Sequence, residues 1–424
     1  MSFNTICVVG LGYIGLPTAA MFASKEKKVI GIDVNQSVVD MINKGSIHIV
    51  EPKLDSMVSE AVQRGFLRAS LIPECSDAFL IAVPTPFVPT TAGDSIPVPD
   101  VTYIQSAAKS IASVLKRGDL VILESTSPVG TTEKIASWLA DYRPDLTFPQ
   151  ANGNESDIRI AYCPERVLPG HVITELVEND RIIGGMTEKC SEKAIELYNM
   201  FVEGEFYVTA TRTAEMAKLT ENASRDVSIA FANELSIICD QLDIDVWDLI
   251  NVANRHPRVN ILKPGPGVGG HCIAVDPWFI VSAAPKHSKL IQTGRAINDA
   301  KPAWVIEKLE LKIVEYFSDH PSQKPSDLVV ACYGLAFKAD IDDLRESPAL
   351  EILRRVTKIN AGVTLAVEPN ISDLPHDLAD AELVQFDDAH VRAHINLILV
   401  DHKSFKERKF GGDYLIDTRG ISKL

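Results

Sequence analysis

The chain has 424 residues, of which 46% are hydrophobic and 23% charged, a composition typical of a globular protein with a large core. This length exceeds what one ordinary core serves, so two or three domains are expected. The formal net charge of −15 argues against nucleic acid as a partner, and no apolar run reaches the roughly 18 residues of a membrane span. An anionic ligand would therefore depend on basic residues gathered locally.

The seven cysteines are scattered along the chain and include no C-x-x-C pair. This arrangement predicts neither a disulfide framework nor a zinc site, so no metal is expected. It is typical of a protein from a reducing compartment.

The N-terminal segment predicts a dinucleotide-binding fold. An apolar run at residues 5–9 is expected to form a buried strand, and it leads directly into Gly10-Leu-Gly12-Tyr-Ile-Gly15 at the start of a helix. In this pattern Gly10 makes the tight turn, Gly12 allows a pyrophosphate to approach, and Gly15 lets helix and strand pack. The alternative is a plain strand-to-helix turn, which the full set of strand, glycines, helix and second strand disfavours.

Asp33 ends the second expected strand, at residues 29–33, and lies near the spacing at which an acid binds the ribose diol. A carboxylate there would repel the extra phosphate of NADP. The sequence therefore predicts NAD as the cofactor.

Polar residues follow further expected strands at residues 78–83 and 120–124. Strand ends border the ligand crevice in such sheets, so Thr85 and Thr126 are candidate contacts of cofactor or substrate. Ordinary turn residues are the alternative.

Glu165 follows Pro164 after a strand expected at residues 160–163. The proline could aim the carboxylate into the crevice, and a solvated loop glutamate is equally consistent with this stretch alone.

Residues 213–242 contain neither glycine nor proline and predict one long helix, about 45 Å in length. Lys218 and Asn222 are four residues apart and so share a face of it. Together they could hold or polarise a substrate oxygen. A solvated helix face is the alternative.

The stretch from Lys263 to Trp278 places four glycines and two prolines before Cys272. Glycine lets a backbone come close to a ligand while proline limits its freedom, so a shaped loop is predicted that could expose a nucleophilic thiol. The alternative is that Cys272 is a small buried hydrophobe. Asp276 either caps the following helix, with Pro277 at its first position, or tunes the thiol one turn away.

A boundary is expected at residues 319–326, followed by a second α/β domain with strands at residues 328–334, 363–368, 395–401 and 414–417. Lys338 and Arg345 follow its first strand and are candidates for the local positive charge that phosphates require. Plain surface charge is the alternative for each.

Taken together, these motifs resemble the UDP-glucose/UDP-mannuronate (GDP-mannose) dehydrogenase family across the whole chain. The segments that carry the resemblance are residues 10–15, 83–86, 124–126, 163–165, 218–222, 264–276, 334–338 and 345–348.

The resemblance implies an α/β protein with two Rossmann-like, doubly wound parallel-sheet domains joined by a long central helix. It implies an NAD-binding domain at residues 1–205, a central helical dimerisation domain carrying the cysteine loop at residues 206–300, and a UDP-sugar-binding domain at residues 301–424. A cytoplasmic homodimer with sites near the subunit interface is implied as well, with neither nucleic acid nor membrane as a partner.

The chemistry implied by the resemblance is a four-electron oxidation at C6 of the sugar, alcohol to acid, with two NAD consumed. Cys272 would capture the aldehyde as a thiohemiacetal, which becomes a thioester that water hydrolyses. Lys218 and Asn222 would stabilise developing oxygen charge, Asp276 and Lys218 would handle the first proton, and Glu165 would serve the hydrolysis.

The binding residues carried over from the family form two groups. The cofactor contacts are Gly10, Gly12, Tyr13, Ile14, Gly15, Asp33, Thr85, Thr126 and Arg345, and Thr126 also counts among the catalytic residues. The substrate contacts are Glu165, Arg166, Val167, Lys218, Asn222, Arg258, Asn260, Gly265, Gly267, Phe337 and Lys338, with Arg258 expected to reach the partner subunit's site.

Residues 163–170, 254–260 and 269–278 are similar to the branch of the family that oxidises UDP-N-acetyl-D-mannosamine for enterobacterial common antigen or another surface polysaccharide. UDP-glucose enzymes often carry a second carboxylate four residues after the Pro-Glu glutamate, where this chain has Pro169. Relatives usually have Pro-Asn at residues 339–340, where this chain has Ala-Asp, so a looser loop is expected there.

Other functions remain open. UDP-GlcNAc or UDP-glucose could be the sugar nucleotide, and a two-electron hydroxyacid or phosphogluconate-type dehydrogenase also combines such a fold with Lys and Asn on a long helix. That class needs no thiol, so a requirement for Cys272 would distinguish the four-electron dehydrogenases from it. A non-catalytic NAD-binding protein would not need the whole set of reactive side chains.

Overall fold

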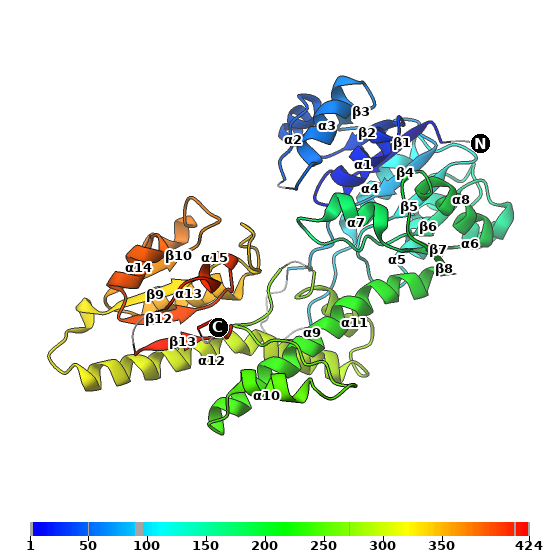
Figure 1. Ribbon diagram of the computed structural model, residues 1–424. Coiled ribbons are helices and arrows are strands. Elements are labelled where there is room, and N and C mark those ends of the chain that lie inside the picture. The colour runs from blue at the N-terminus through cyan, green and yellow to red at the C-terminus, as the bar shows by residue number, and fades with distance from the viewer. Residues whose placement is uncertain (1–2, 50, 90–95, 271, 411–412, 423–424) are drawn as a thin grey trace. The chain divides into compact units, whose positions relative to one another are not determined.

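A computed structural model describes residues 3–49, 51–89, 96–270, 272–410 and 413–422 (Figure 1). Contacts divide the chain into two compact units, which are treated separately. The N-terminal unit comprises Met1–Thr220 and Trp278–Ala284, and the C-terminal unit comprises Glu221–Pro277 and Pro285–Leu424. The division into three domains stays a prediction.

The N-terminal unit is built on an eight-stranded sheet in the order β3-β2-β1-β4-β5-β6-β7-β8. The first six strands are parallel and have the strand order of dinucleotide-binding folds. β7 pairs antiparallel with β6 and parallel with β8. The strands are β1 (Thr5–Val9), β2 (Lys28–Ile32), β3 (Leu67–Ser70), β4 (Ala78–Ile81), β5 (Leu120–Leu123), β6 (Arg159–Tyr162), β7 (Arg181–Gly185) and β8 (Phe206–Ala210).

The central strands β4 and β5 are apolar at every position, and β1 at all but its first, because helices cover both faces of the sheet. In β1, Ile6 and Val8 join a core formed with α1 (Gly15–Ser24) and α3 (Leu54–Gln63). Cys7 and Val9 join a second core with α4 (Thr102–Ala112) and α5 (Thr131–Tyr142). Further helices are α2 (Gln36–Asn43), α6 (Pro149–Asn152), α7 (Val172–Glu178) and α8 (Glu188–Tyr198).

The C-terminal unit contains a second, wholly parallel sheet in the order β11-β10-β9-β12-β13, as the sequence predicts. Two cores cover its faces. The strands are β9 (Val329–Tyr333), β10 (Val363–Val367), β11 (Ala381–Leu383), β12 (Ile395–Ile398) and β13 (Leu415–Asp417). The helices α13 (Pro348–Ile359), α14 (Phe386–Arg392) and α15 (Lys403–Lys406) accompany them.

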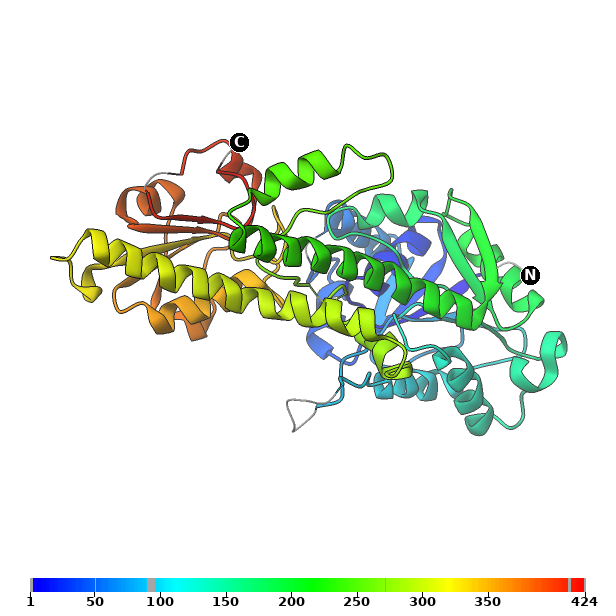
Figure 2. The same cartoon turned by 90° about the horizontal axis from the view of Figure 1, so that it is seen from below.

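The predicted long helix is confirmed as α9 (Thr211–Gln241). Within the C-terminal unit it runs beside α12 (Lys289–Asp319), as Figure 2 shows. Buried polar groups join the two helices: Arg295 Nη1 lies 2.7 Å from Asp226 Oδ1, and Lys301 Nζ donates to Ser236 Oγ at 2.6 Å. Two shorter helices, α10 (Val246–Ala253) and α11 (Asp276–Ala283), complete the set.

Within the described ranges, no helix combines the length and the apolar character that crossing a bilayer requires.

We expect Asp226→Ala to lower the free energy of unfolding by about 1.5–3 kcal/mol, because it removes the buried one of the two carboxylates that pair with the Arg295 guanidinium and leaves only Asp299. The measurement is urea unfolding followed by circular dichroism. Asp388→Ala is the control, since its ion pair with Arg392 is exposed and should cost about 1 kcal/mol or less. Equal losses in the two variants would contradict this account.

Candidate functional site

The three glycines of the N-terminal turn have distinct structural roles. Gly10 adopts a φ of +95°, and a Cβ there would lie 2.5 Å from the carbonyl oxygen of Ala82. At Gly15 a Cβ would lie 1.8 Å from the carbonyl oxygen of Gly10. At Gly12 a Cβ would meet no atom within 4 Å, so this position faces open space. The geometry fits a pyrophosphate that approaches the backbone at Gly12.

Asp33 lies beside this turn, as predicted. Its Oδ2 accepts from the backbone N of Leu11 at 3.2 Å and its Oδ1 from that of Asn35 at 2.9 Å. The carboxylate is therefore held at the end of β2, where it can face a ribose diol. Tyr13 is exposed and Ile14 half-buried in the same turn.

Thr85 and Thr126 are brought together by the adjacent strands β4 and β5. The Thr85 hydroxyl donates to the carbonyl oxygen of Thr126 at 2.7 Å. Thr85 is buried, whereas Thr126 is half-buried. Their contact with a ligand stays a prediction.

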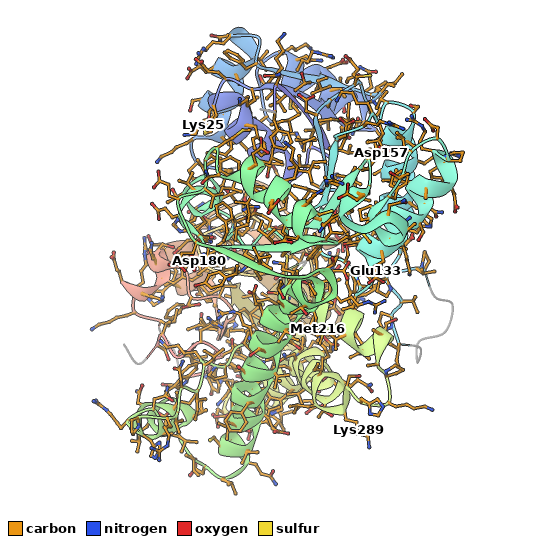
Figure 3. All side chains as sticks on the ribbon, turned by 90° about the vertical axis from the view of Figure 1, so that its right-hand side faces the viewer. Lys25, Glu133, Asp157, Asp180, Met216 and Lys289 are labelled. Atoms are coloured by element: carbon orange, nitrogen blue, oxygen red, sulfur yellow. The ribbon has the colours of Figure 1, made fainter. Side chains whose placement is uncertain are left out.

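Glu215 on α9 is a structural residue that sequence reasoning missed. Its buried carboxylate accepts from the backbone N of Gly130 at 2.5 Å and from that of Thr132 at 2.8 Å, so it caps α5 after the Thr126 segment. On the outer side of the same contact, Arg212 pairs with Glu133, which Figure 3 labels. No local pattern marks such a cap, because its partners lie more than 80 residues away.

Glu165 is 7% exposed, so the alternative of a solvated loop glutamate is wrong. Its Oε2 accepts from Nη2 of Arg181, at the start of β7, at 2.8 Å. The neighbouring Arg166 and Val167 are half-buried. Arg181 is a second residue that the sequence did not single out.

In the C-terminal unit, Cys272 is exposed. The alternative of a buried hydrophobe is therefore wrong for this cysteine. It does describe Cys7, whose pKa is raised to about 12 mainly by burial, and four other buried cysteines, Cys163, Cys190, Cys239 and Cys332. Cys272 thus has the access that a nucleophile needs.

Asp276 lies at the start of α11, one turn after Cys272, and its tuning of the thiol stays a prediction. It is the first residue of α11, and its backbone N donates to the carbonyl oxygen of Cys272 at 2.9 Å, which places it one turn from the thiol. Its side chain is 4% exposed and accepts from Nδ2 of Asn222 at 2.5 Å. The structure therefore brings together three predicted catalytic residues, Cys272, Asp276 and Asn222.

The glycine loop before Cys272 packs against the segment that precedes α13. A Cβ at Gly267 would lie 2.9 Å from the ring of Pro348, and one at Gly270 would lie 2.9 Å from Phe337. Gly265 donates its backbone N to Asn233 Oδ1 on α9 at 2.9 Å. Gly265, Gly267 and Phe337, which were predicted from distant motifs, thus lie in one region.

The segment after β9 is more tightly held than expected. The backbone N of Asp340 donates to Nδ1 of His402 at 2.9 Å, and Asp340 Oδ1 accepts from the backbone N of Lys403 at 2.9 Å. The expectation of a looser loop at residues 339–340 is therefore wrong. Nearby, Lys338 is exposed, and Arg345 is also exposed and pairs with Asp343 at 2.6 Å.

The remaining site residues are distributed over the two units. Thr126, Glu165 and Lys218 belong to the N-terminal unit, and Lys218 is half-buried on α9. Arg258 and Asn260 are exposed in the C-terminal unit, after α10. Their catalytic and binding roles stay predictions.

Comparison with known families accounts for most of the chain. Residues 4–202 match the NAD binding domain of the UDP-glucose/GDP-mannose dehydrogenase family, residues 212–300 match its central domain, and residues 331–423 match its UDP binding domain. The glycine turn and Asp33 thus lie in an NAD binding domain, as the sequence predicts.

Three relatives are similar over nearly the full length. The chain is 59% identical over 427 residues to the UDP-N-acetyl-D-mannosamine dehydrogenase of Escherichia coli K12, covering 99% of this chain and 100% of that protein. It is 59% identical over 426 residues to an NDP-N-acetyl-D-galactosaminuronic acid dehydrogenase of Ralstonia nicotianae, covering 99% of this chain and 97% of the relative. The solved UDP-N-acetyl-mannosamine dehydrogenase of Staphylococcus aureus aligns with a TM-score of 0.83 and 41% identity, covering 99% and 96% of the two chains.

We expect Gly12→Ala to weaken NAD binding by about tenfold or more while leaving the melting temperature nearly unchanged, because its Cβ fills only the open space at the turn. Gly15→Ala is the contrasting variant and should destabilise the fold, since its Cβ meets the backbone of Gly10. Calorimetric titration with NAD and thermal unfolding measure the two effects. A Gly12→Ala variant that binds NAD normally would show that this space does not receive the pyrophosphate.

Proposed function

The chain belongs to the UDP-glucose/GDP-mannose dehydrogenase family, as its motifs predict, and from this premise we propose that it oxidises C6 of UDP-N-acetyl-D-mannosamine to the carboxylate. It is an NAD-dependent oxidoreductase. The observation that carries the proposal is the exposed Cys272, one turn from the buried Asp276, which accepts a hydrogen bond from the half-buried Asn222. The matched UDP binding domain and the 59% identity to the Escherichia coli enzyme support the substrate.

NAD, held by the glycine turn and Asp33, would accept one hydride in each of the two oxidations. Cys272 explains why both can occur on one enzyme, because its sulfur would bond to C6 of the aldehyde and retain it as a thiohemiacetal. The second oxidation then leaves a thioester on the same sulfur. Water releases the uronate by hydrolysis.

The other predicted catalytic side chains suit proton transfer and the stabilisation of charge. Asp276 is buried and fixed by Asn222, so its carboxylate can hold a proton-bearing group in one orientation. Lys218 lies four residues before Asn222 along α9 and supplies the positive charge that a developing alkoxide requires. Glu165 would receive a proton from the water that attacks the thioester.

A second substrate is favoured by a specific comparison. The Ralstonia relative, named for N-acetyl-D-galactosaminuronic acid, has the same identity to this chain as the Escherichia coli enzyme. A nucleotide-linked N-acetylgalactosamine is therefore the second candidate, ahead of UDP-GlcNAc and UDP-glucose. All four sugars share the same reaction at C6.

The cellular setting follows from the family resemblance. We propose a cytoplasmic homodimer whose product enters a surface polysaccharide such as enterobacterial common antigen.

We expect two NADH for each UDP-N-acetyl-D-mannosamine supplied in limiting amount, because the thiol retains the aldehyde for a second oxidation. Cys272→Ala should lose net turnover, whereas Cys75→Ala, which removes an exposed cysteine of the N-terminal unit, should behave as wild type. Absorbance of NADH at completion measures both.

The same assay with UDP-GalNAc, UDP-GlcNAc and UDP-glucose identifies the sugar from the highest kcat/KM. One NADH per sugar, or a Cys272→Ala variant that turns over normally, would instead identify a two-electron dehydrogenase.

A further inference from the structure

A buried cluster of charges surrounds Glu165 in the N-terminal unit. Both of its carboxylate oxygens accept hydrogen bonds, Oε1 from the backbone N of Arg166 at 3.0 Å and Oε2 from Nη2 of Arg181 at 2.8 Å. Arg181 is itself only 4% exposed. The direction of the carboxylate is therefore set by one backbone donor and one charged donor, rather than by solvent.

The antiparallel pairing of β6 and β7 brings these two residues together. Glu165 follows β6 by three residues, and Arg181 is the first residue of β7, directly after Asp180, which Figure 3 labels. The guanidinium carbon of Arg181 lies 4.1 Å from the ring centroid of Tyr198 on α8. Stacking on this ring limits the orientations that the guanidinium can adopt.

Glu124 adds a second carboxylate to the cluster from the end of β5. It is 2% exposed, and its Oε1 accepts from the hydroxyl of Tyr198 at 2.6 Å and lies 3.9 Å from Nη1 of Arg181. Among the described residues, neither Oε2 of Glu124 nor Nη1 of Arg181 has a hydrogen-bond partner. Glu124 can therefore gain or lose a proton without breaking the bond between Arg181 and Glu165.

One guanidinium thus faces two buried carboxylates. The titratable groups that act on Glu124 are Glu165 and Cys163 after β6, Arg181 on β7, and Tyr198 on α8. Burial, and after it the charge of Glu165, raises the pKa of Glu124 to about 7. Burial also raises the pKa of Cys163 and that of Tyr198, so neither is charged near neutral pH. Glu124 is therefore the group whose charge changes there.

We propose that Arg181 and Glu124 are positioning residues for Glu165 in hydrolysis of the thioester, an inference that rests on the function proposed above. Arg181 aims the carboxylate, and an ionised Glu124 makes Glu165 a stronger base by placing negative charge beside it. In this step the oxygen of water bonds to the thioester carbon, and the C–S bond breaks with its electron pair leaving on Cys272 as thiolate. One water proton goes to Glu165 and the other remains on the released carboxylic acid, so atoms and charge balance.

The test separates hydrolysis from the two oxidations in Glu124→Gln and Arg181→Met. Arg159→Met is the matched control, because Arg159 begins β6 as Arg181 begins β7 but bonds to Ser156. With UDP-N-acetyl-D-mannosamine and NAD, both variants should form two NADH per site in the first turnover, while steady-state turnover falls about tenfold or more. Acid-quenched protein should carry the sugar acyl adduct on Cys272 by mass spectrometry. The control should match wild type.

The pH dependence of turnover distinguishes a positioning role of Glu124 from a merely structural one, which would leave the pH profile unchanged. In wild type, steady-state turnover should rise as pH passes through the pKa of Glu124, about 7, and Glu124→Gln should lack this step.

The stability of the wild-type fold should change with pH in the opposite direction to its turnover. The folded-state pKa of Glu124 lies above the ordinary value of a glutamate, so its contribution to stability is lost as pH rises through about 7. The melting temperature of wild type should therefore fall relative to that of Glu124→Gln as pH rises from about 5 to about 8.

Two results would overturn the inference. One is wild-type turnover in both variants at every pH, and the other is a first-turnover yield of NADH that falls in proportion to the steady-state rate. If Arg181→Met does not fold, the pH profile of Glu124→Gln decides alone. Failure of the proposed function is distinct, because wild type would then give one NADH per sugar or Cys272→Ala would still turn over.

Discussion

Parallel strand pairing is the constraint on which the N-terminal part of the site depends. β1, β4, β5 and β6 are consecutive neighbours in the sheet and all run in one direction, so their carboxyl ends meet at one edge. The segments that follow these strands carry the glycine turn, Thr85, Thr126 and Glu165. Residues more than 150 positions apart in the chain thus share an edge.

Buried charges then fix the loops at the strand ends. Glu215 caps the helix after the Thr126 segment, and Arg181 holds Glu165. In the C-terminal unit, Glu368 accepts from two backbone amides after β9, at 2.8 and 3.1 Å, and its Oε2 lies 3.0 Å from Nε2 of His402. Each of these groups would be left unpaired in the interior if its loop moved, at a cost of several kcal/mol. Loop conformations that would otherwise be variable are therefore narrowly defined.

The sequence predicts the buried apolar strands and the long helix well and the partly polar strands poorly, for a physical reason. β1 and α9 are confirmed nearly to the residue, because burial on both faces or a long stretch without glycine and proline leaves a strong pattern. β3, β7, β8 and β11 are missed, since polar, glycine or exposed positions interrupt the apolar pattern in each of them. The sequence singled out the motif residues, whose roles stay predictions, but it did not single out Arg181 and Glu215. Their partners come from other elements, and no local spacing marks such pairs.

The proline at position 169 shows how a change in one loop is linked to the buried cluster. Its side chain is exposed, and the two residues around the start of α7, Gly170 and Val172, donate their backbone N–H groups to the buried carboxylate of Glu51, each at 2.8 Å. A second acid at position 169, as in UDP-glucose enzymes, would stand one residue from an amide already bound by a carboxylate, and like charges there would repel. In this chain the second carboxylate near Glu165 is instead Glu124, directly after the central strand β5. A loop carboxylate in solvent would be ionised throughout the neutral range, whereas burial gives Glu124 a pKa of about 7, so the negative charge beside Glu165 depends on pH.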